Sequence, residues 1–217
     1  MTSAPTLVLA SASPARLATL RSAGIAPYVL VSGVDEDEAV RRYGELAPDE
    51  VALVLARAKA EAVAAVLDGE SAPDDAPEDA IVLGCDSVLE LDGEAHGKPA
   101  DATEATARWQ RMRGRSGVLH TGHWVVDLRE DGMGATLGAV ASTTVHFADV
   151  TDDEIAAYVA TGEPLAVAGA FTTDGLGGAF VRGIEGDHHT VVGVSLPLLR
   201  DLLGECGVAW TSLWTPR

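Results

Sequence analysis

LVLASASPARLATL, residues 7–20, runs from an apolar strand directly into a helix that ends near Gly24. Ser13 suits the N-cap of this helix and Pro14 suits its first position. Arg16 in the first turn is unusual, because the positive end of a helix dipole disfavours a cation. An anion such as phosphate, bound by the free N–H groups there, would explain Arg16. The alternative is an ordinary Ser-capped helix with a solvent-facing arginine.

Strands and helices alternate along the first half of the chain, and strands pair locally further on. The segments expected as strands are 6–10, 28–32, 80–91, 120–131 and 139–148. The segments expected as further helices are 48–66, 103–113, 151–162 and 195–207. Asp92-Gly93 predicts a hairpin, Thr151 with Glu154 predicts a capping box, and GLGG at 175–178 predicts a turn. This order favours an α/β protein with a mixed sheet.

The charge balance limits the partners of the chain, which can form one large domain or two small lobes from its 217 residues. The formal net charge is -18, which disfavours nucleic acid as a ligand. A small anionic substrate stays possible where a few cations converge or a divalent metal intervenes. Part of the negative charge lies in 67–80, LDGESAPDDAPEDA, which predicts a solvated loop.

Location is predicted from the absence of two signals. No run of eighteen or more apolar residues occurs, and the N-terminus lacks the basic and long apolar regions of a secretory signal. We therefore expect a cytoplasmic protein with no membrane partner. Cys85 and Cys206 lie in apolar contexts without CxxC spacing, which predicts two reduced, buried thiols.

Three charged residues stand at positions where function is plausible. Lys59 lies on the shoulder of an apolar helical stripe, and its alternative is a snorkelling surface lysine. Asp86 ends the apolar run IVLGC, where a buried strand is expected to reach the edge of the sheet; its alternative is a turn or capping residue. Lys98 precedes Pro99 after the hairpin, and its alternative is a loop lysine.

The histidine pairs do not predict a zinc site. A strand would direct His120 and His123 to opposite faces, and His188 and His189 are adjacent in sequence.

Taken together, the motifs resemble those of the Maf family, the septum-formation-inhibitor-like nucleoside triphosphate pyrophosphatases. The matching blocks are LASASPARLATLRSAGI, VDEDE, LARAKAEAV, VLGCDSVLELDGEAHGKP, YVATGEPLAVAGAFTTDGLGGAFV and GDHHTVVGVSLPLL. The resemblance implies a single Maf-like domain over 1–217, with a mixed curved β-sheet flanked by helices and two lobes around a substrate cleft (Maf/ITPase-like). It also implies hydrolysis of a nucleoside triphosphate to the monophosphate and pyrophosphate, a divalent cation (Mg²⁺ or Mn²⁺) and a possible homodimer.

The same resemblance implies roles for individual residues. Asp86 corresponds to the catalytic proton acceptor, and with Glu36 it would bind the metal. The residues implied to hold the triphosphate are Ser11, Arg16, Lys59 and Lys98. Three positions that differ between family branches of different base preference are here Ala15, Ser87 and Asp174; Ala15 departs from the usual basic residue. A non-catalytic regulator of cell division, binding a nucleotide or protein partner through the same cleft, is the alternative function.

Overall fold

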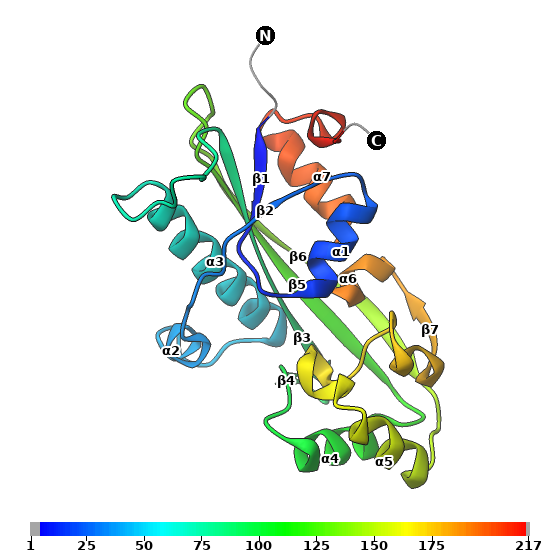
Figure 1. The fold of residues 1–217 in the computed structure, drawn as a ribbon. Coiled ribbons are helices and arrows are strands. Elements are labelled where there is room, and N and C mark those ends of the chain that lie inside the picture. The colour runs from blue at the N-terminus through cyan, green and yellow to red at the C-terminus, as the bar shows by residue number, and fades with distance from the viewer. Residues whose placement is uncertain (1–4, 216–217) are drawn as a thin grey trace.

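A seven-stranded mixed sheet forms the centre of the computed structural model, which describes residues 5–215 (Figure 1). Its strands are β1 (Thr6–Leu9), β2 (Tyr28–Val29), β3 (Ala80–Leu91), β4 (Glu94–His96), β5 (Ser116–Asp127), β6 (Thr136–Phe147) and β7 (Val181–Glu185). The strand order is β2-β1-β3-β5-β6-β7, and β4 also pairs with β3. β1 runs parallel to β2 and β3, whereas the other pairs are antiparallel. The predicted mixed α/β fold is confirmed, although the strand expected at 28–32 is shorter.

Helices flank this sheet. They are α1 (Pro14–Ser22), α2 (Glu36–Arg41), α3 (Pro48–Leu67), α4 (Ala102–Met112), α5 (Asp152–Ala160), α6 (His188–Val192) and α7 (Leu196–Glu205). Four 3₁₀ helices are η1 (Glu163–Ala166), η2 (Ala168–Ala170), η3 (Leu176–Phe180) and η4 (Trp210–Leu213). The long helices agree with the sequence, whereas α2 and α6 are too short to show a period. The turn expected at 175–178 is largely the helix η3. Along residues 5–215, no helix has the length and apolar composition that a membrane crossing needs.

Short sequence motifs correctly predicted where several helices and strands begin or end. Asp92 and Gly93 both have positive φ, 58° and 79°, as a two-residue hairpin turn requires. The side chains of Thr151 and Glu154 form the predicted capping box of α5. Both cysteines are buried and free, as expected.

The apolar core is divided between two halves of the molecule. In one half, α3 covers one face of the sheet, and α1 and α7 cover the other (Figure 1). In the other half, α4 and α5 pack at the far ends of β3, β5 and β6 (Figure 1). Trp109 is fully buried there and makes edge-to-face contacts with Phe147 and Tyr158, at ring-centroid distances of 5.8 and 5.5 Å. Among the strands of residues 5–215, only β3, β5 and β6 are long enough to join the two halves.

Two glycines allow α3 to approach the sheet closely. A β-carbon on Gly84 would lie 2.1 Å from the carbonyl oxygen of Ala56, and one on Gly122 would lie 2.3 Å from that of Ala52. Any side chain at either position would push the helix away. Because side chains alternate along a strand, Asp86 shares the face of Gly84 and meets α3 at this close contact.

Candidate active site

β3 has a gap in its pairing where the two halves meet. On one edge it pairs with β1 over Ala80–Leu83 and with β4 over Leu89–Leu91, while β5 pairs continuously along its other edge. Within residues 5–215, no strand pairs with the first edge between those two segments, and we call this gap the notch. Asp86 lies in the notch. The expected strand 80–91 contains Asp86, and β3 does continue past this residue; Asp86 lies beyond the point where the neighbouring strand β1 ends.

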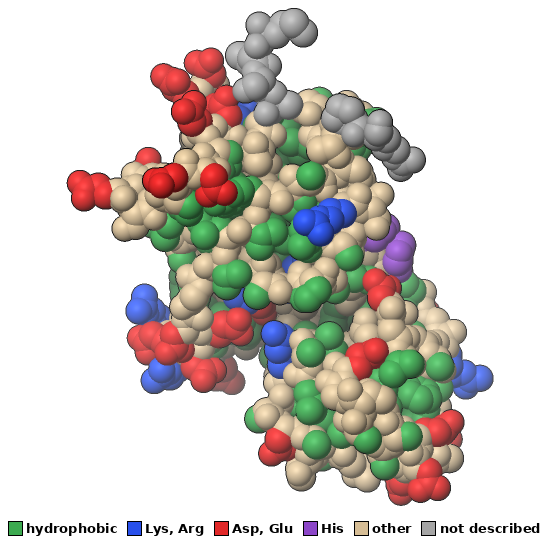
Figure 2. Space-filling view, in the orientation of Figure 1, with side chains coloured by type: hydrophobic (Ala, Val, Ile, Leu, Met, Phe, Trp, Pro, Cys, Tyr) green, Lys and Arg blue, Asp and Glu red, His purple; other side chains and the backbone are tan. Residues whose placement is uncertain are grey.

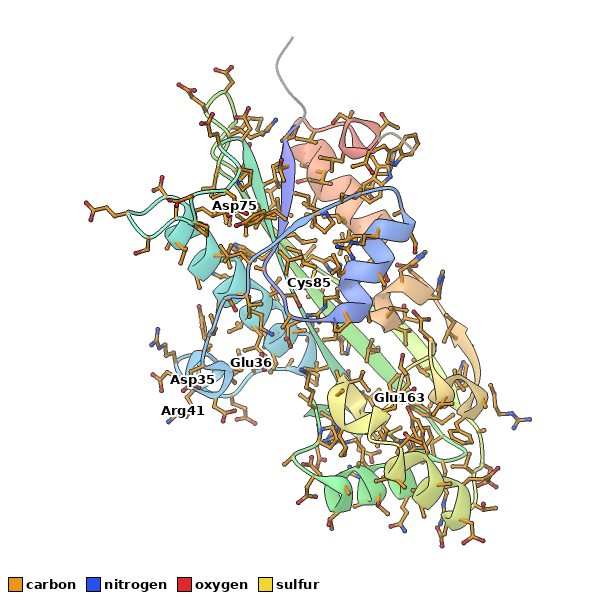
Figure 3. All side chains as sticks on the ribbon, viewed as in Figure 1. Asp35, Glu36, Arg41, Asp75, Cys85 and Glu163 are labelled. Carbon is orange, nitrogen blue, oxygen red and sulfur yellow. The ribbon has the colours of Figure 1, made fainter. Side chains whose placement is uncertain are left out.

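A charged triad occupies the α3 side of the notch. The Lys59 ammonium donates a hydrogen bond to Asp86 Oδ1 and lies 2.7 Å from Glu36 Oε1. The side chains of Lys59 and Asp86 are only 12% and 11% exposed, whereas that of Glu36 is 54% exposed. Figure 3 shows Glu36 on α2 beside α3. Three predicted site residues, far apart in sequence, thus converge.

The protonation of Asp86 is set by opposing effects. Burial raises the pKa of this carboxyl above its ordinary value, the charges of Lys59 and Arg16 lower it, and that of Glu36 raises it. The net direction is upward. A carboxylate with a raised pKa is a better proton acceptor near neutral pH than an exposed aspartate.

Arg16 lies at the opposite face of β3, where its guanidinium belongs to a buried hydrogen-bond network. Its Nε donates to the carbonyl of Gly193 at 2.8 Å, and its two terminal nitrogens donate to Ser11 Oγ and Ser87 Oγ, each at 3.1 Å. Gly193 has a φ of 117°, and a β-carbon there would lie 3.0 Å from Arg16 Nε. Arg16 is buried, with 8% of its surface exposed. A guanidinium carries five N–H groups, so donors remain for an anion.

Ser87 belongs to a buried relay of hydroxyls. Thr121 gives its only hydroxyl hydrogen to the carbonyl of Thr190, at 2.8 Å. Ser87 must therefore be the donor in its own 2.8 Å contact with Thr121. The hydroxyl of Ser87 is thus committed to Thr121 and Arg16, and it has one acceptor position left.

The N-terminus of α1 is capped as predicted. Ser13 Oγ accepts from the N–H of Arg16 at 3.4 Å, and Ser13 O accepts from that of Leu17 at 3.2 Å. Ser11 Oγ accepts from the N–H of Ser13 and from Arg16, so it orients the arginine. Pro14 has no N–H. Among residues 5–215, the first turn therefore leaves the N–H of Ala15 without a partner.

Two other predicted residues lie on the surface. Lys98 is exposed and forms no ion pair within the described part of the chain. Asp174 is also exposed and lines a hollow of about 320 Å³, together with α1 residues Ala18 and Thr19 and with His188 and His189 of α6. Neither Ala15 nor Ser87 is among the described residues that line this hollow. The three positions grouped by the sequence are therefore not gathered around it.

The histidines have structural contacts. His123 is fully buried: its Nδ1 donates to the carbonyl of Thr121 at 3.0 Å, and its Nε2 accepts from the N–H of Ser195 at 2.8 Å. Burial lowers the pKa of His123 to about 4. Ligand atoms of Asp187, His188 and His189 lie within 4.8 Å of one another. The Asp187 carboxylate already caps α6 through the N–H of His189 and the hydroxyl of Thr190.

Sequence reasoning missed the residues that complete the Arg16 network: Thr121, His123, Thr190 and Gly193. A signal existed for Gly193, since a glycine between two apolar helical runs favours a helix end. The spacing of Thr121 and His123 also places both on one strand face, which the contacts confirm. Nothing local indicated that this face meets Arg16.

The fold and the site define an α/β protein with a mixed sheet and a buried, lysine-paired carboxylate in the notch between its two halves. Figure 2 shows basic side chains at the hollow between the halves, with acidic side chains beside them and more at the outer edges of the molecule. A family described as "Maf-like protein" matches residues 6–206, and the chain belongs to this family.

Curated relatives match the chain over nearly its full length. It is 61% identical to the nucleoside triphosphate pyrophosphatase of Salinispora tropica over 209 residues, which cover 96% of this chain and 87% of the relative. It is 57% identical to the protein of the same name from Streptomyces avermitilis over 211 residues, covering 97% and 95%. A crystal structure of a nucleoside-triphosphatase, a dITP/XTP pyrophosphatase, from Mycobacterium abscessus covers 93% of this chain and 94% of its own. Its TM-score of 0.36 and identity of 13% are too low to carry an argument.

Proposed function

We propose that the chain hydrolyses nucleoside triphosphates to the monophosphate and pyrophosphate, and so removes unwanted nucleotides from the cellular pool. The observation that carries this proposal is the buried Asp86–Lys59 pair in the notch, in a chain 57% and 61% identical to relatives named nucleoside triphosphate pyrophosphatase. The alternative, a binding regulator of cell division, has no need of a buried carboxylate among phosphate-binding cations.

In the proposed reaction, the oxygen of water bonds to phosphorus while the bond between the α- and β-phosphates breaks. Asp86 accepts the proton that the attacking water loses, and its raised pKa suits that role. Lys59, Lys98 and the remaining donors of Arg16 hold the triphosphate and offset the charge that develops on its oxygens. Ser11 keeps Arg16 in place, and the free N–H of Ala15 offers a further donor.

A divalent metal fits the donor chemistry of Glu36 and Asp86. Both carboxylates already converge on one cationic group, the ammonium of Lys59, and oxygen donors suit Mg²⁺ or Mn²⁺. When bound, the metal would supply charge stabilisation to the phosphate oxygens. Lys59 would then exchange its carboxylate partners for phosphate oxygens.

We assign base selection to Asp174. A carboxylate only accepts hydrogen bonds, so it favours a base edge with donors, such as guanine N1–H and N2–H₂, over the carbonyl oxygens of uracil or thymine. Asp174 lies beside Thr19 and the α6 histidines on the wall of the hollow, which we assign to the base. Ala15 affects selectivity because it lacks the basic side chain usual at this position. Ser87 affects selectivity indirectly, through its hydrogen bond with Arg16.

Other features of the proposal follow from the resemblance and the proposed substrate. The chain acts as a single domain in the cytoplasm, where nucleoside triphosphates are made and used, and it pairs as a homodimer. The net charge of -18 argues against nucleic acid as a partner.

The central experiment incubates the purified protein with a panel of nucleotides and Mg²⁺, and separates pyrophosphate from orthophosphate. Pyrophosphate with the matching monophosphate is expected, and activity should disappear in EDTA and return with added Mg²⁺ or Mn²⁺. Orthophosphate alone would contradict the proposed reaction, and full activity in the chelator would contradict the metal. A kcat/KM for UTP or dTTP well above that for GTP would contradict the base preference.

A further inference from the structure

Glu163 has no part in the chemistry proposed above, yet it gathers an unusual set of donors. It opens η1, in the half of the molecule built around α4 and α5 (Figure 3). Its Oε1 accepts from the N–H of Gly177 and from the hydroxyl of Tyr158, each at 2.9 Å. Its Oε2 accepts from the N–H of Leu176 at 3.0 Å. One carboxylate therefore holds two backbone groups of the segment that follows Asp174.

The backbone of this segment lies directly against the Glu163–Tyr158 pair. A β-carbon on Gly175 would lie 2.3 Å from Glu163 Oε2, and one on Gly177 would lie 2.3 Å from the hydroxyl oxygen of Tyr158. Side chains at these glycines would separate the segment from its acceptors. The sequence DGLGG therefore fits a backbone segment that hydrogen bonds hold in place. A simple turn would tolerate larger residues at these glycines.

Glu163 stays ionised while it makes these contacts. Burial alone would raise the pKa of this carboxyl, but the N–H groups of Gly177 and Leu176 and the hydroxyl of Tyr158 outweigh burial and lower it. A charged acceptor makes stronger hydrogen bonds to N–H groups than a neutral one.

Asp174 depends on this support because its own contacts are few. Its N–H donates to Thr172 Oγ1 at 3.2 Å, and its side chain is exposed on the wall of the hollow. We infer that Glu163 is a positioning residue that holds 174–177 so that the Asp174 carboxylate keeps its place against the incoming base. This inference rests on the proposed function, because it gives Glu163 its effect through the base preference assigned to Asp174.

The test substitutes Glu163→Gln, which keeps the size of the side chain but replaces one acceptor oxygen with an NH₂ donor. At least one of the two backbone bonds must then break. Glu154→Gln is the matched control: it removes the same charge from the neighbouring helix α5, where the Glu154 carboxylate accepts hydrogen bonds from its capping partner Thr151. The measurements are amide exchange at Leu176 and Gly177, and kcat and KM for GTP and UTP.

We expect exchange at one or both of the Leu176 and Gly177 amides to accelerate at least about tenfold in Glu163→Gln, as the loss of a hydrogen bond to a charged group implies. The ratio of kcat/KM for GTP to that for UTP should fall about tenfold through KM, with kcat for GTP changed by less than about twofold. In the Asp174→Asn background, Glu163→Gln should not change this ratio further. Glu154→Gln should leave both the exchange and the ratio as in the wild type.

Each of the other outcomes would overturn a stated part of the proposal. Unchanged amide exchange in Glu163→Gln would overturn the positioning role itself. Equal losses for GTP and UTP, with accelerated exchange, would reduce Glu163 to a purely structural residue and overturn the inference. If Asp174→Asn alone leaves the GTP-to-UTP ratio of kcat/KM unchanged, the role in base selection proposed for Asp174 is overturned. If Glu163→Gln nevertheless lowers this ratio, Glu163 does not act through Asp174.

Discussion

The two faces of β3 at the notch carry opposite kinds of polar chemistry, although Asp86 and Ser87 are neighbours in sequence. On the α3 face, Asp86 shares the ammonium of Lys59 with an exposed carboxylate, Glu36. On the α1 face, Ser87 joins a buried network in which Arg16 and Thr121 already have partners. Period-2 alternation alone separates the two residues onto these faces.

Under the proposed function, the difference lets one strand serve catalysis on one face and stability on the other. The α3 face retains charges that can exchange partners when a substrate or a metal arrives. The α1 face fixes Arg16 through contacts that any rearrangement would leave unsatisfied, and unsatisfied buried groups are costly. Substitutions on the first face should therefore chiefly change turnover, whereas those in the buried network of the second face should also change the free energy of unfolding.

The largest effect is expected on the α3 face. Asp86→Asn keeps the size of the side chain but removes its charge, and should lower kcat by about 10²–10⁴-fold, the usual range for a lost general base. Pyrophosphate release measures the rate, and circular dichroism checks the fold. The matched control is Asp201→Asn, an exposed aspartate that pairs only with its neighbour Arg200. An unchanged kcat in Asp86→Asn would remove this residue from the mechanism.

A second prediction concerns His123 on the α1 face and the dependence of stability on pH. Its pKa is lowered from 6.5 to about 4 in the folded protein, so between these values the unfolded chain binds a proton that the folded protein does not. Stability present above pH 6.5 is therefore lost as the pH falls to 4, by roughly 3 kcal/mol. Glutamine does not titrate, and its amide offers a donor and an acceptor, as the neutral imidazole does. The stability of the wild type relative to His123→Gln should therefore fall by that amount between pH 6.5 and 4.

Urea denaturation of both proteins at several pH values from 7.5 to 4 measures this gap. A gap that stays constant over the range would mean that His123 titrates normally in the folded protein. Turnover at neutral pH should differ little between the two proteins, as the division between the faces requires.

Lys59 should have a smaller effect with a distinctive pH signature. Lys59→Met keeps much of the apolar stem but removes the charge that lowers the pKa of Asp86, so this pKa should rise further. The acidic limb of the kcat/KM profile should then move to higher pH, and KM should rise about tenfold through the lost phosphate contact. Arg57→Met, on the exposed side of the same helix, is the control. An acidic limb that moves to lower pH would contradict the described pairing.

The smallest effect is expected at Lys98, outside both faces. Lys98→Ala should raise KM about threefold, because an exposed cation contributes little to binding in water. The free energy of unfolding should stay within about 0.5 kcal/mol of the wild type. Arg182→Ala, another exposed basic residue, should leave KM unchanged. Equal effects of the two substitutions on KM would show that only the overall charge matters.

Features that depend on neighbouring residues could be predicted from the sequence. The strand-to-helix junction with Ser13 at its cap, the Asp92-Gly93 hairpin and the capping box of α5 are all local, because turn dihedrals and capping bonds involve residues a few positions apart. Lys59 and Asp86 stood out locally as charges beside an apolar stripe or run, but only the resemblance to the Maf family selected them over the structural alternatives.

Only the tertiary structure decided how these residues meet. The notch exists because β1 ends while β3 continues, and α3 reaches Asp86 because Gly84 and Gly122 leave no side chain between them. Arg16 bonds to Gly193, 177 positions away, a partner that the sequence did not indicate for a first-turn arginine. Contacts over such separations depend on the packing of all the intervening elements, so no local pattern encodes them. The sequence by itself therefore determined the elements and the candidate groups, and the packing determined which groups became partners.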